Sequence, residues 1–301
     1  MRRGQVSVSL ATTATSVRVV HSAHCPEIGP ICAERDEPPQ LHDQRFTIVE
    51  ARLVGVYAVT EHLGVELQLP LKLNRTRVEY QRLDGTPFTP DYPNIHHRNE
   101  TLWGLGDPWL LGRLAGGGAG ITFTGRAGVS LPLGSTEPNP FELGEMGLEH
   151  QHVQLGTGTV DPILALEVGR MLGRRVRLAA QGQAQLVLYE NGEGYRAGNR
   201  YAGGLQARVS VLPSLSISLT ADLVNERAER WDGEVLQDGN LGRTDVLLGG
   251  GATYAVGGYA LTAAVRVPVH QDIAQAGDEA GQLSYPAIVE LTVGRTFETT
   301  E

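Results

Sequence analysis

The chain has 301 residues, of which 41% are hydrophobic, 6% aromatic and 20% charged, with a formal net charge of −9. This negative charge argues against nucleic acid as a partner, because a polyanion is bound by basic surfaces. The sequence contains no run of about 20 apolar residues that could form a transmembrane helix, and no linker divides it, so we expect one domain over residues 1–301.

The beginning of the chain already alternates like a strand. Gln5–Leu10 reads as β-structure, and the stretch Met1–Val6 has no apolar core of the kind found in a secretory signal peptide. If the protein is exported, either its natural beginning is missing from this sequence or the exported location is wrong. We expect the first, because Gln5–Leu10 already reads as a strand.

The first long polar stretch, roughly His21–Gln44, contains the only two cysteines, Cys25 and Cys32. In an exported protein, two cysteines this close in sequence are expected to form a disulfide that closes a small loop. A metal-binding pair is the alternative, although two thiols do not complete a zinc shell.

Short and long connections alternate along the rest of the chain. The short ones lie at Val59–Leu63, Ala115–Gly118, Leu172–Arg175, Leu212–Ser214 and Val256–Gly258. The long ones lie at roughly His21–Gln44, Gln81–Gly106, Gly134–Val160, Glu190–Asn199, Glu226–Arg243 and His270–Gln282. This alternation is typical of strands that cross a bilayer up and down, with brief turns on one side. We therefore predict an all-β fold, an antiparallel up-and-down transmembrane β-barrel of about 12 strands. The strands are expected to begin near Gln5, Arg45, Leu63, Asp107, Gly120, Asp161, Arg175, Arg200, Leu215, Thr244, Tyr259 and Leu283.

Within these strands, apolar residues occupy every second position. Residues two apart share a face of a strand, so one face of the wall would meet lipid and the other a polar interior. The residues that we expect to line the lumen are Glu50, Arg52, Glu66, Gln68, Lys72, Arg126, Glu167, Arg177, Gln181, Gln183, Gln185, Gln206, Arg208, Asp222, Asp245, Arg266 and Glu290. Their charges balance, which predicts little selection between anions and cations. The charges fit cross-strand bracing and pore lining equally well, and twelve strands predict a narrow or partly obstructed passage.

Aromatic residues and short Gly/Asp/Thr clusters mark the strand ends. Tyr57, Tyr80, Trp109, Tyr189, Tyr201, Tyr254, Tyr259, Tyr285 and Phe297 are expected at the membrane interfaces. Asp107, Thr157, Thr159 and Asp161 are expected to bond nearby backbone at strand entrances. A binding role is the alternative for these four residues.

Three short motifs carry a family resemblance. Gly104-Leu105-Gly106-Asp107, Leu131-Pro132-Leu133-Gly134 and Leu155–Pro162 occur in the order in which a family of outer-membrane transporters linked to the meta-pathway of phenol degradation has them. Over roughly residues 45–297 the chain resembles that family, although Leu133 stands where the family more often has Thr. The long first loop with its histidines is a further departure. The resemblance implies an outer-membrane channel for small, often apolar compounds.

Eight of the nine histidines lie in or beside long connections. His96-His97 and His150-Gln151-His152 are candidate ligands for a transition metal. Solvated loop histidines without a metal are the commoner interpretation.

The function predicted from the sequence is a channel or transporter for passive passage of small molecules, apolar or aromatic ones among them. We expect it in the bacterial outer membrane, with extracellular long loops, periplasmic termini and no cofactor. Its partners would be the lipid bilayer, a small solute and the barrel assembly machinery, since the last strand alternates up to Phe297. The alternatives are a barrel scaffold with receptor or metal-binding loops and, further off, an outer-membrane hydrolase. An enzyme is not expected, because the sequence lacks Gly-x-Ser-x-Gly and a suggestive Ser/His spacing.

Overall fold

A computed structural model describes residues 2–23, 40–90, 95, 97–237, 239–274 and 284–298. Cys25, Cys32 and His96 lie outside these residues, so the disulfide stays a prediction.

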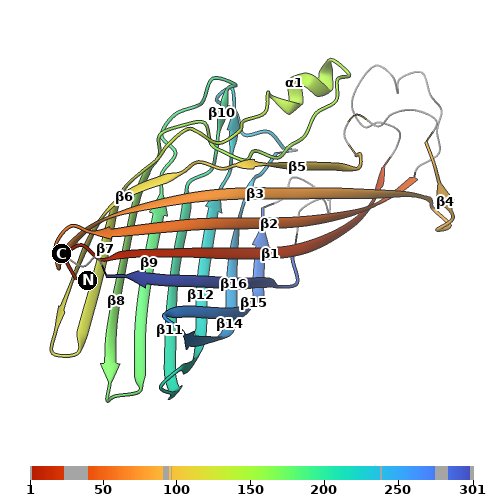
Figure 1. Cartoon of the computed structure of the whole chain (residues 1–301). Coiled ribbons are helices and arrows are strands. Elements are labelled where there is room, and N and C mark those ends of the chain that lie inside the picture. Colours follow the sequence, from red (N-terminus) through yellow and green to blue (C-terminus); the bar gives the residue numbers. More distant parts are fainter. Residues whose placement is uncertain are drawn as a thin grey trace.

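The chain forms a closed antiparallel barrel of twelve strands, one of which is interrupted (Figure 1). The wall consists of β1 (Val6–Ala23), β2 (Gln40–Ala58), β3 (Leu63–Arg82), β5 (Glu100–Leu105) with β6 (Trp109–Gly118), β7 (Ile121–Ser130), β8 (Pro162–Leu172), β9 (Val176–Gln185), β11 (Arg200–Leu212), β12 (Leu215–Arg227), β14 (Gly242–Val256), β15 (Tyr259–Ile273) and β16 (Ile288–Phe297). The predicted fold class is confirmed.

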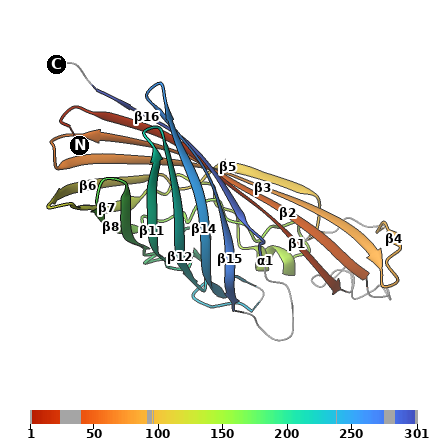
Figure 2. The same ribbon diagram turned by 90° about the horizontal axis from the view of Figure 1, so that it is seen from below.

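The barrel closes between its first and last strands. β1 pairs on one side with β2 and on the other with β16, with Val6 opposite Phe297. β16 pairs with β1 only as far as Ala14. The rest of β1, on the long-loop side, therefore extends beyond the end of β16. β1, β2 and β3 are the longest strands, and Figure 2 shows them running well beyond β6–β8 at the long-loop end.

All short turns lie at the end where the chain begins and finishes. The N–H of Gly4 donates to Ala58 O beside the turn between β2 and β3. Ala119 and Gly120 both have positive φ (51° and 79°), as do Gly257 and Gly258 (56° and 81°). Two successive residues of positive φ make the hairpin turn that matches strand twist.

Several predicted boundaries were wrong. The turn expected at Ala115–Gly118 lies at 119–120, and residues 115–118 belong to β6. These strand glycines admit close neighbours: a Cβ on Gly116 would lie 2.7 Å from the Phe123 ring. β2 begins five residues before Arg45, and β16 begins at Ile288 rather than near Leu283. The expected loop Gln81–Gly106 contains β5, which pairs with β3 ahead of β6.

The outer face carries the apolar rows. On β3, Leu63, Val65, Leu67 and Leu71 are 41–51% exposed, whereas the intervening Glu66 and Gln68 are 1% and 6% exposed. Large apolar side chains on the other strands repeat this exposure, for example Leu205, Leu219 and Leu291 at 57–65%. A protein in water would not expose so many, whereas a lipid-facing wall requires them. Among the described residues, no helix is long and apolar enough to cross a bilayer.

The connections at the other end of the barrel are partly folded. They contain β4 (Pro87–Phe88), α1 (Pro140–Glu145), β10 (Tyr195–Arg196) and β13 (Arg230–Trp231). β10 pairs with β13, and Val187, Tyr195, Ala197 and Trp231 form a buried cluster with Phe141 and Leu236 packed against it. These loops therefore have a small core of their own.

Candidate functional site: the inner face of the barrel

The strand registers place the predicted lumen residues on the inner face. Glu50 lies opposite Lys72, Glu167 opposite Gln181, and Arg177 opposite Arg208. The full set on this face comprises Glu50, Arg52, Glu66, Gln68, Lys72, Arg126, Glu167, Arg177, Gln181, Gln183, Gln185, Gln206, Arg208, Asp222, Asp245, Arg266 and Glu290. Their part in transport remains a proposal.

A charged cluster braces the wall formed by β2, β3, β6 and β7. The buried carboxylate of Glu66 accepts a hydrogen bond of 2.6 Å from Gln68 and contacts Nη1 of Arg113 and of Arg126 at 3.1 and 3.4 Å. Arg52 joins this cluster by donating to the Gln68 amide oxygen at 2.8 Å and to Glu50 at 2.7 Å. A buried carboxylate is stable only with such partners, so this cluster fixes the inner surface here.

Ion pairs also connect neighbouring strands elsewhere on the inner face. Arg177 pairs with Glu167 at 2.6 Å. Arg266 lies between Glu290 and Asp222, at 2.5 and 3.9 Å. The first cluster therefore has three arginines against two carboxylates, whereas Arg266 faces two carboxylates.

Asp107 and Asp161 hold the connection between β7 and β8 against the wall. Asp107 accepts hydrogen bonds from Gly134 N at 2.9 Å and from Thr157 N and Oγ1 at 2.5 and 2.8 Å. Asp161, which is fully buried, accepts from the Thr159 hydroxyl and from Gln185 Nε2 at 2.6 and 2.9 Å. It also lies 2.9 Å from the Thr157 hydroxyl, whose single proton it shares with Asp107. The two aspartates therefore have structural contacts, but not with nearby backbone as expected: Asp107 bonds the distant Gly134 and Thr157, and Asp161 accepts from side chains.

The glycines of the same three motifs allow this contact. A Cβ on Gly156 would lie 2.9 Å from Gly134 Cα, and a Cβ on Gly106 would lie 3.0 Å from Leu155 O. Any side chain there would push the connection away from the wall. The three motifs that carry the family resemblance thus meet at one place in the fold.

The connection also reaches the inner surface of β3. Lys72 Nζ donates to Leu155 O at 2.7 Å, and Lys72 lies level with Leu71 and Leu73 of the lipid-facing belt. The segment around Leu155 therefore enters the barrel and narrows it on this side.

Toward the long-loop end, the inner face of β1–β3 carries apolar side chains among polar ones such as Asn74. Val17 lies opposite Phe46, which lies opposite Thr76, and Val19, Gln44 and Val78 form the next inner row. Val17 and Val78 are buried at 2% and 7%, whereas Ile48, also on the inner face, is 37% exposed. We call Val17, Val19, Phe46, Ile48 and Val78 the inner apolar patch.

Sequence reasoning missed some inner residues and misplaced some aromatic rings. Arg113 points to the inner face with Trp109 and Leu111, and these apolar neighbours hid it from the sequence analysis. Arg243 was expected in the loop before its strand, but it belongs to β14 and pairs with Asp245 at 2.8 Å. Trp109 is 9% exposed beneath the Arg52 guanidinium, at 4.6 Å, and is not at an interface. Tyr80 and Tyr285 also bond inner groups, His97 O and Asp245 respectively. The other aromatics predicted at interfaces are 38–49% exposed, namely Tyr57, Tyr189, Tyr201, Tyr254, Tyr259 and Phe297.

The candidate metal ligands are not gathered around one point among the described residues. His97 Nδ1 lies 2.9 Å from His42 Nδ1, whereas His150 and His152 have ring centroids 5.4 Å apart. Burial and the neighbouring His150 lower the pKa of His152 to about 4, which favours its neutral form. The metal site stays a prediction.

Comparison with solved structures places this barrel among known folds. An outer-membrane channel from Pseudomonas putida F1 superposes with a TM-score of 0.63 at 14% identity, over 99% of this chain and 97% of that one. The chain has the fold of that channel. The toluene transporters TbuX of Ralstonia pickettii and TodX of P. putida give TM-scores of 0.44 at 9% and 10% identity, over 99% and 100% of this chain and 90% and 92% of theirs. No family model and no curated protein matches the sequence, so the resemblance to the phenol-pathway family stays a prediction.

Proposed function

We propose that the chain is an outer-membrane channel through which small molecules pass passively, apolar and aromatic ones among them. The observation that carries this proposal is the closed wall, apolar outside and charged inside. A closed barrel leaves no unpaired strand edge in the hydrocarbon, which is why barrels can span membranes. The shared fold with an outer-membrane channel supports the same location.

In the proposed orientation, the short turns and both termini face the periplasm and the long loops face the exterior. An even number of strands returns the chain to the side where it began, and Figure 1 has the N- and C-terminal ends together, away from α1. The barrel assembly machinery would read the last strand, whose outer residues Val289, Leu291 and Val293 alternate up to Phe297.

The inner apolar patch supports an apolar or aromatic solute. It lies on the long-loop side of the charged clusters, so a solute entering from that side meets Ile48 and Phe46 before it meets Glu50 and Arg52. An apolar surface releases water when such a solute binds.

Solute flux through the purified protein tests this proposal. The protein would be reconstituted in liposomes, and uptake of a labelled monoaromatic alcohol would be compared with uptake of a sugar of similar size. We expect flux of both solutes above that of empty liposomes and a higher rate for the aromatic one. Absence of flux in correctly folded protein would contradict the channel and favour a receptor scaffold, and lipid hydrolysis by the pure protein would favour an enzyme.

A variant pair tests the role of the patch. Phe46→Ser with Ile48→Ser removes two apolar side chains from it, and Val54→Ser with Val56→Ser makes the same change nearer the short turns on the inner face of β2. We expect the first pair to lower the preference for the aromatic solute and the second to leave it unchanged. Equal effects of both pairs would contradict a specific role for the patch.

A further inference from the structure

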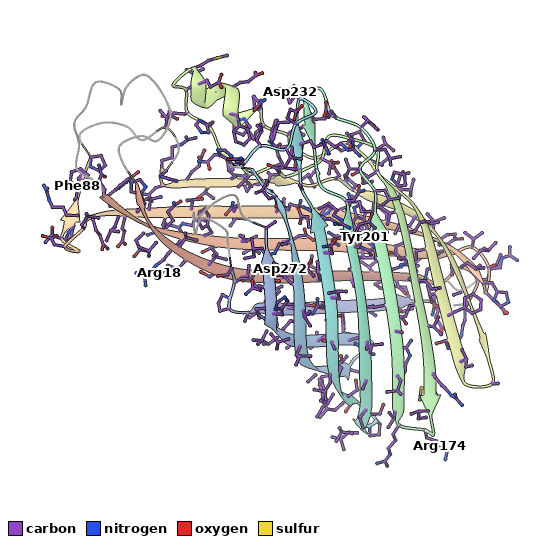
Figure 3. The ribbon with its side chains drawn as sticks, turned by 180° about the vertical axis from the view of Figure 1, so that it is seen from behind. Arg18, Phe88, Arg174, Tyr201, Asp232 and Asp272 are labelled. Atoms are coloured by element: carbon purple, nitrogen blue, oxygen red, sulfur yellow. The ribbon has the colours of Figure 1, made fainter. Side chains whose placement is uncertain are left out.

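Four arginines stand together on the outer face of the three longest strands. Arg18 of β1 lies directly opposite Arg45 of β2, which lies directly opposite Arg77 of β3. Arg75 is two residues from Arg77 on the same face. All four are exposed, and Figure 3 labels Arg18 on the long-loop part of the wall. We call these residues the arginine face.

Few carboxylates offset the positive charge of this row. Like charges directly opposite each other across an antiparallel pair repel. Only Arg18 has an ion-pair partner, donating to both oxygens of Asp43 at 2.9 and 2.6 Å. Within the described part of the chain, Arg45, Arg75 and Arg77 make no ion pair. The next outer row toward the long loops contains two carboxylates, Asp43 and Glu79; Asp43 is paired with Arg18, and Glu79 is in no ion pair among the described residues.

The arginine face begins where the apolar belt ends. The outer row of β3 is apolar from Leu63 to Leu73, and the next outer residues are Arg75 and Arg77. The ten residue steps of this row, at ~3.4 Å each and tilted by about 45°, give a height of about 24 Å, which matches the apolar band of an outer-membrane barrel. Arg75 and Arg77 therefore stand at the headgroup level of the leaflet on the long-loop side.

A groove adjoins the same residues. It has a volume of about 510 Å³ and lies where the upper half of β1 extends past β16. Its lining includes Ser16, Arg18, Arg45 and residues 284–286. Two of the four arginines thus line a groove as well as standing on the outer wall.

We propose that the arginine face binds the phosphate groups of a phosphorylated glycolipid of the outer leaflet. Guanidinium groups match phosphate oxygens in charge and geometry, and a headgroup with two phosphates can span neighbouring arginines of the row. A bound phosphate also removes the repulsion within the row. This inference rests on the proposed outer-membrane orientation, which places the long-loop side in the glycolipid leaflet.

Binding of defined lipids by the folded, detergent-solubilised full chain tests the proposal. The probes are bisphosphorylated lipid A, the same lipid A without phosphates, phosphatidylglycerol and inorganic phosphate, each followed by native mass spectrometry. Arg45→Gln, Arg75→Gln and Arg77→Gln are combined in one variant. The matched control combines Arg170→Gln, Arg174→Gln and Arg175→Gln, exposed arginines at the short-turn end, where Figure 3 labels Arg174.

We expect the first variant to bind bisphosphorylated lipid A about tenfold more weakly or worse, and the control variant to bind it as the natural chain does. Equal binding by the two variants would overturn the proposal. So would equal binding of dephosphorylated lipid A or phosphatidylglycerol, or full competition by inorganic phosphate, which would indicate a general lipid or free-anion site. If the natural chain conducts solute but does not bind lipid A, this inference is refuted and the channel is not. If it binds lipid A but conducts no solute, the channel is refuted and this inference is not.

Discussion

Lys72 on the inner face of β3 donates a hydrogen bond of 2.7 Å to the carbonyl oxygen of Leu155, a residue of the connection between β7 and β8. This contact ties a loop from the far side of the β5–β6 strand to the wall of the barrel. The width of the passage therefore depends on how firmly the segment around Leu155 is held against β3.

Replacing Lys72 should therefore widen the passage. Lys72→Met removes the donor while keeping the length of the side chain, and a hydrogen bond from a charged donor is worth about 1.5–3 kcal/mol. We expect larger and noisier single-channel conductance in planar bilayers. Lys72→Arg keeps a donor and should stay close to the natural conductance, and identical traces for both variants would refute a role for this contact.

Removing the charge of Asp161 should weaken the barrel near β8 and β9. In Asp161 the oxygen Oδ1 accepts from Thr159, and Oδ2 accepts from Thr157 and Gln185. Asp161→Asn turns one of these two acceptors into a donor, and leaving a buried group unsatisfied costs about 1–3 kcal/mol. The temperature at which the folded band of the variant disappears in gel electrophoresis should be lower than that of the natural chain. The exposed Asp84 is a suitable control position, and an equal fall in Asp84→Asn would contradict this assignment.

Ion selectivity should respond to Glu66. Glu66→Gln leaves Arg113 and Arg126 without their shared carboxylate. One unit charge about 8 Å from an ion in water changes its energy by about 0.5 kcal/mol, a factor of about two in permeability. The reversal potential in a salt gradient should shift toward anions, while Glu79→Gln on the outer face should leave it unchanged. A shift toward cations would be inconsistent with the ion pairs described.

Acid should loosen the loops around α1. The folded-state pKa of His152, lowered to about 4 by burial and by His150, lies below the unfolded value near 6.5. The unfolded loop therefore takes up a proton first, and stability present above pH 6.5 is lost as the pH falls toward 4, by about 1.4 kcal/mol per pH unit in this window.

Protease cleavage of the loops between pH 7 and pH 4.5 measures this effect. The His152 ring meets Phe141 edge to face at 5.0 Å, so cleavage near α1 should rise as the pH falls. His152→Gln should flatten the dependence, and His62→Gln at a short turn should preserve it. A natural chain whose cleavage does not change with pH would contradict the assignment.

The sequence predicted the barrel wall well because alternation is a local signal. Val65, Leu67 and Leu71 face outward and Glu66 and Gln68 inward, as their spacing indicates. The prediction failed at Ala115–Gly118, where a run of glycines was taken for a turn. Gly116 lies inside β6, and its lack of a side chain leaves room for the Phe123 ring. The contact of Asp107 with Thr157 joins residues fifty positions apart, and no local pattern reports such a distance. The outer arginine row also needed the register, because Arg18, Arg45 and Arg77 lie on three different strands.

Site-directed spin labelling of β3 tests the central claim, a closed barrel with lipid outside and water within. Labels would be placed singly at Val65, Leu67, Leu71 and Leu73 and at Gln68, Asn74 and Thr76, with Cys25 and Cys32 replaced by serine. We predict that the first four labels, in liposomes, are relaxed by oxygen dissolved in the lipid and the other three by a water-soluble nickel reagent. Loss of this two-residue alternation, or its reversal, would contradict the account.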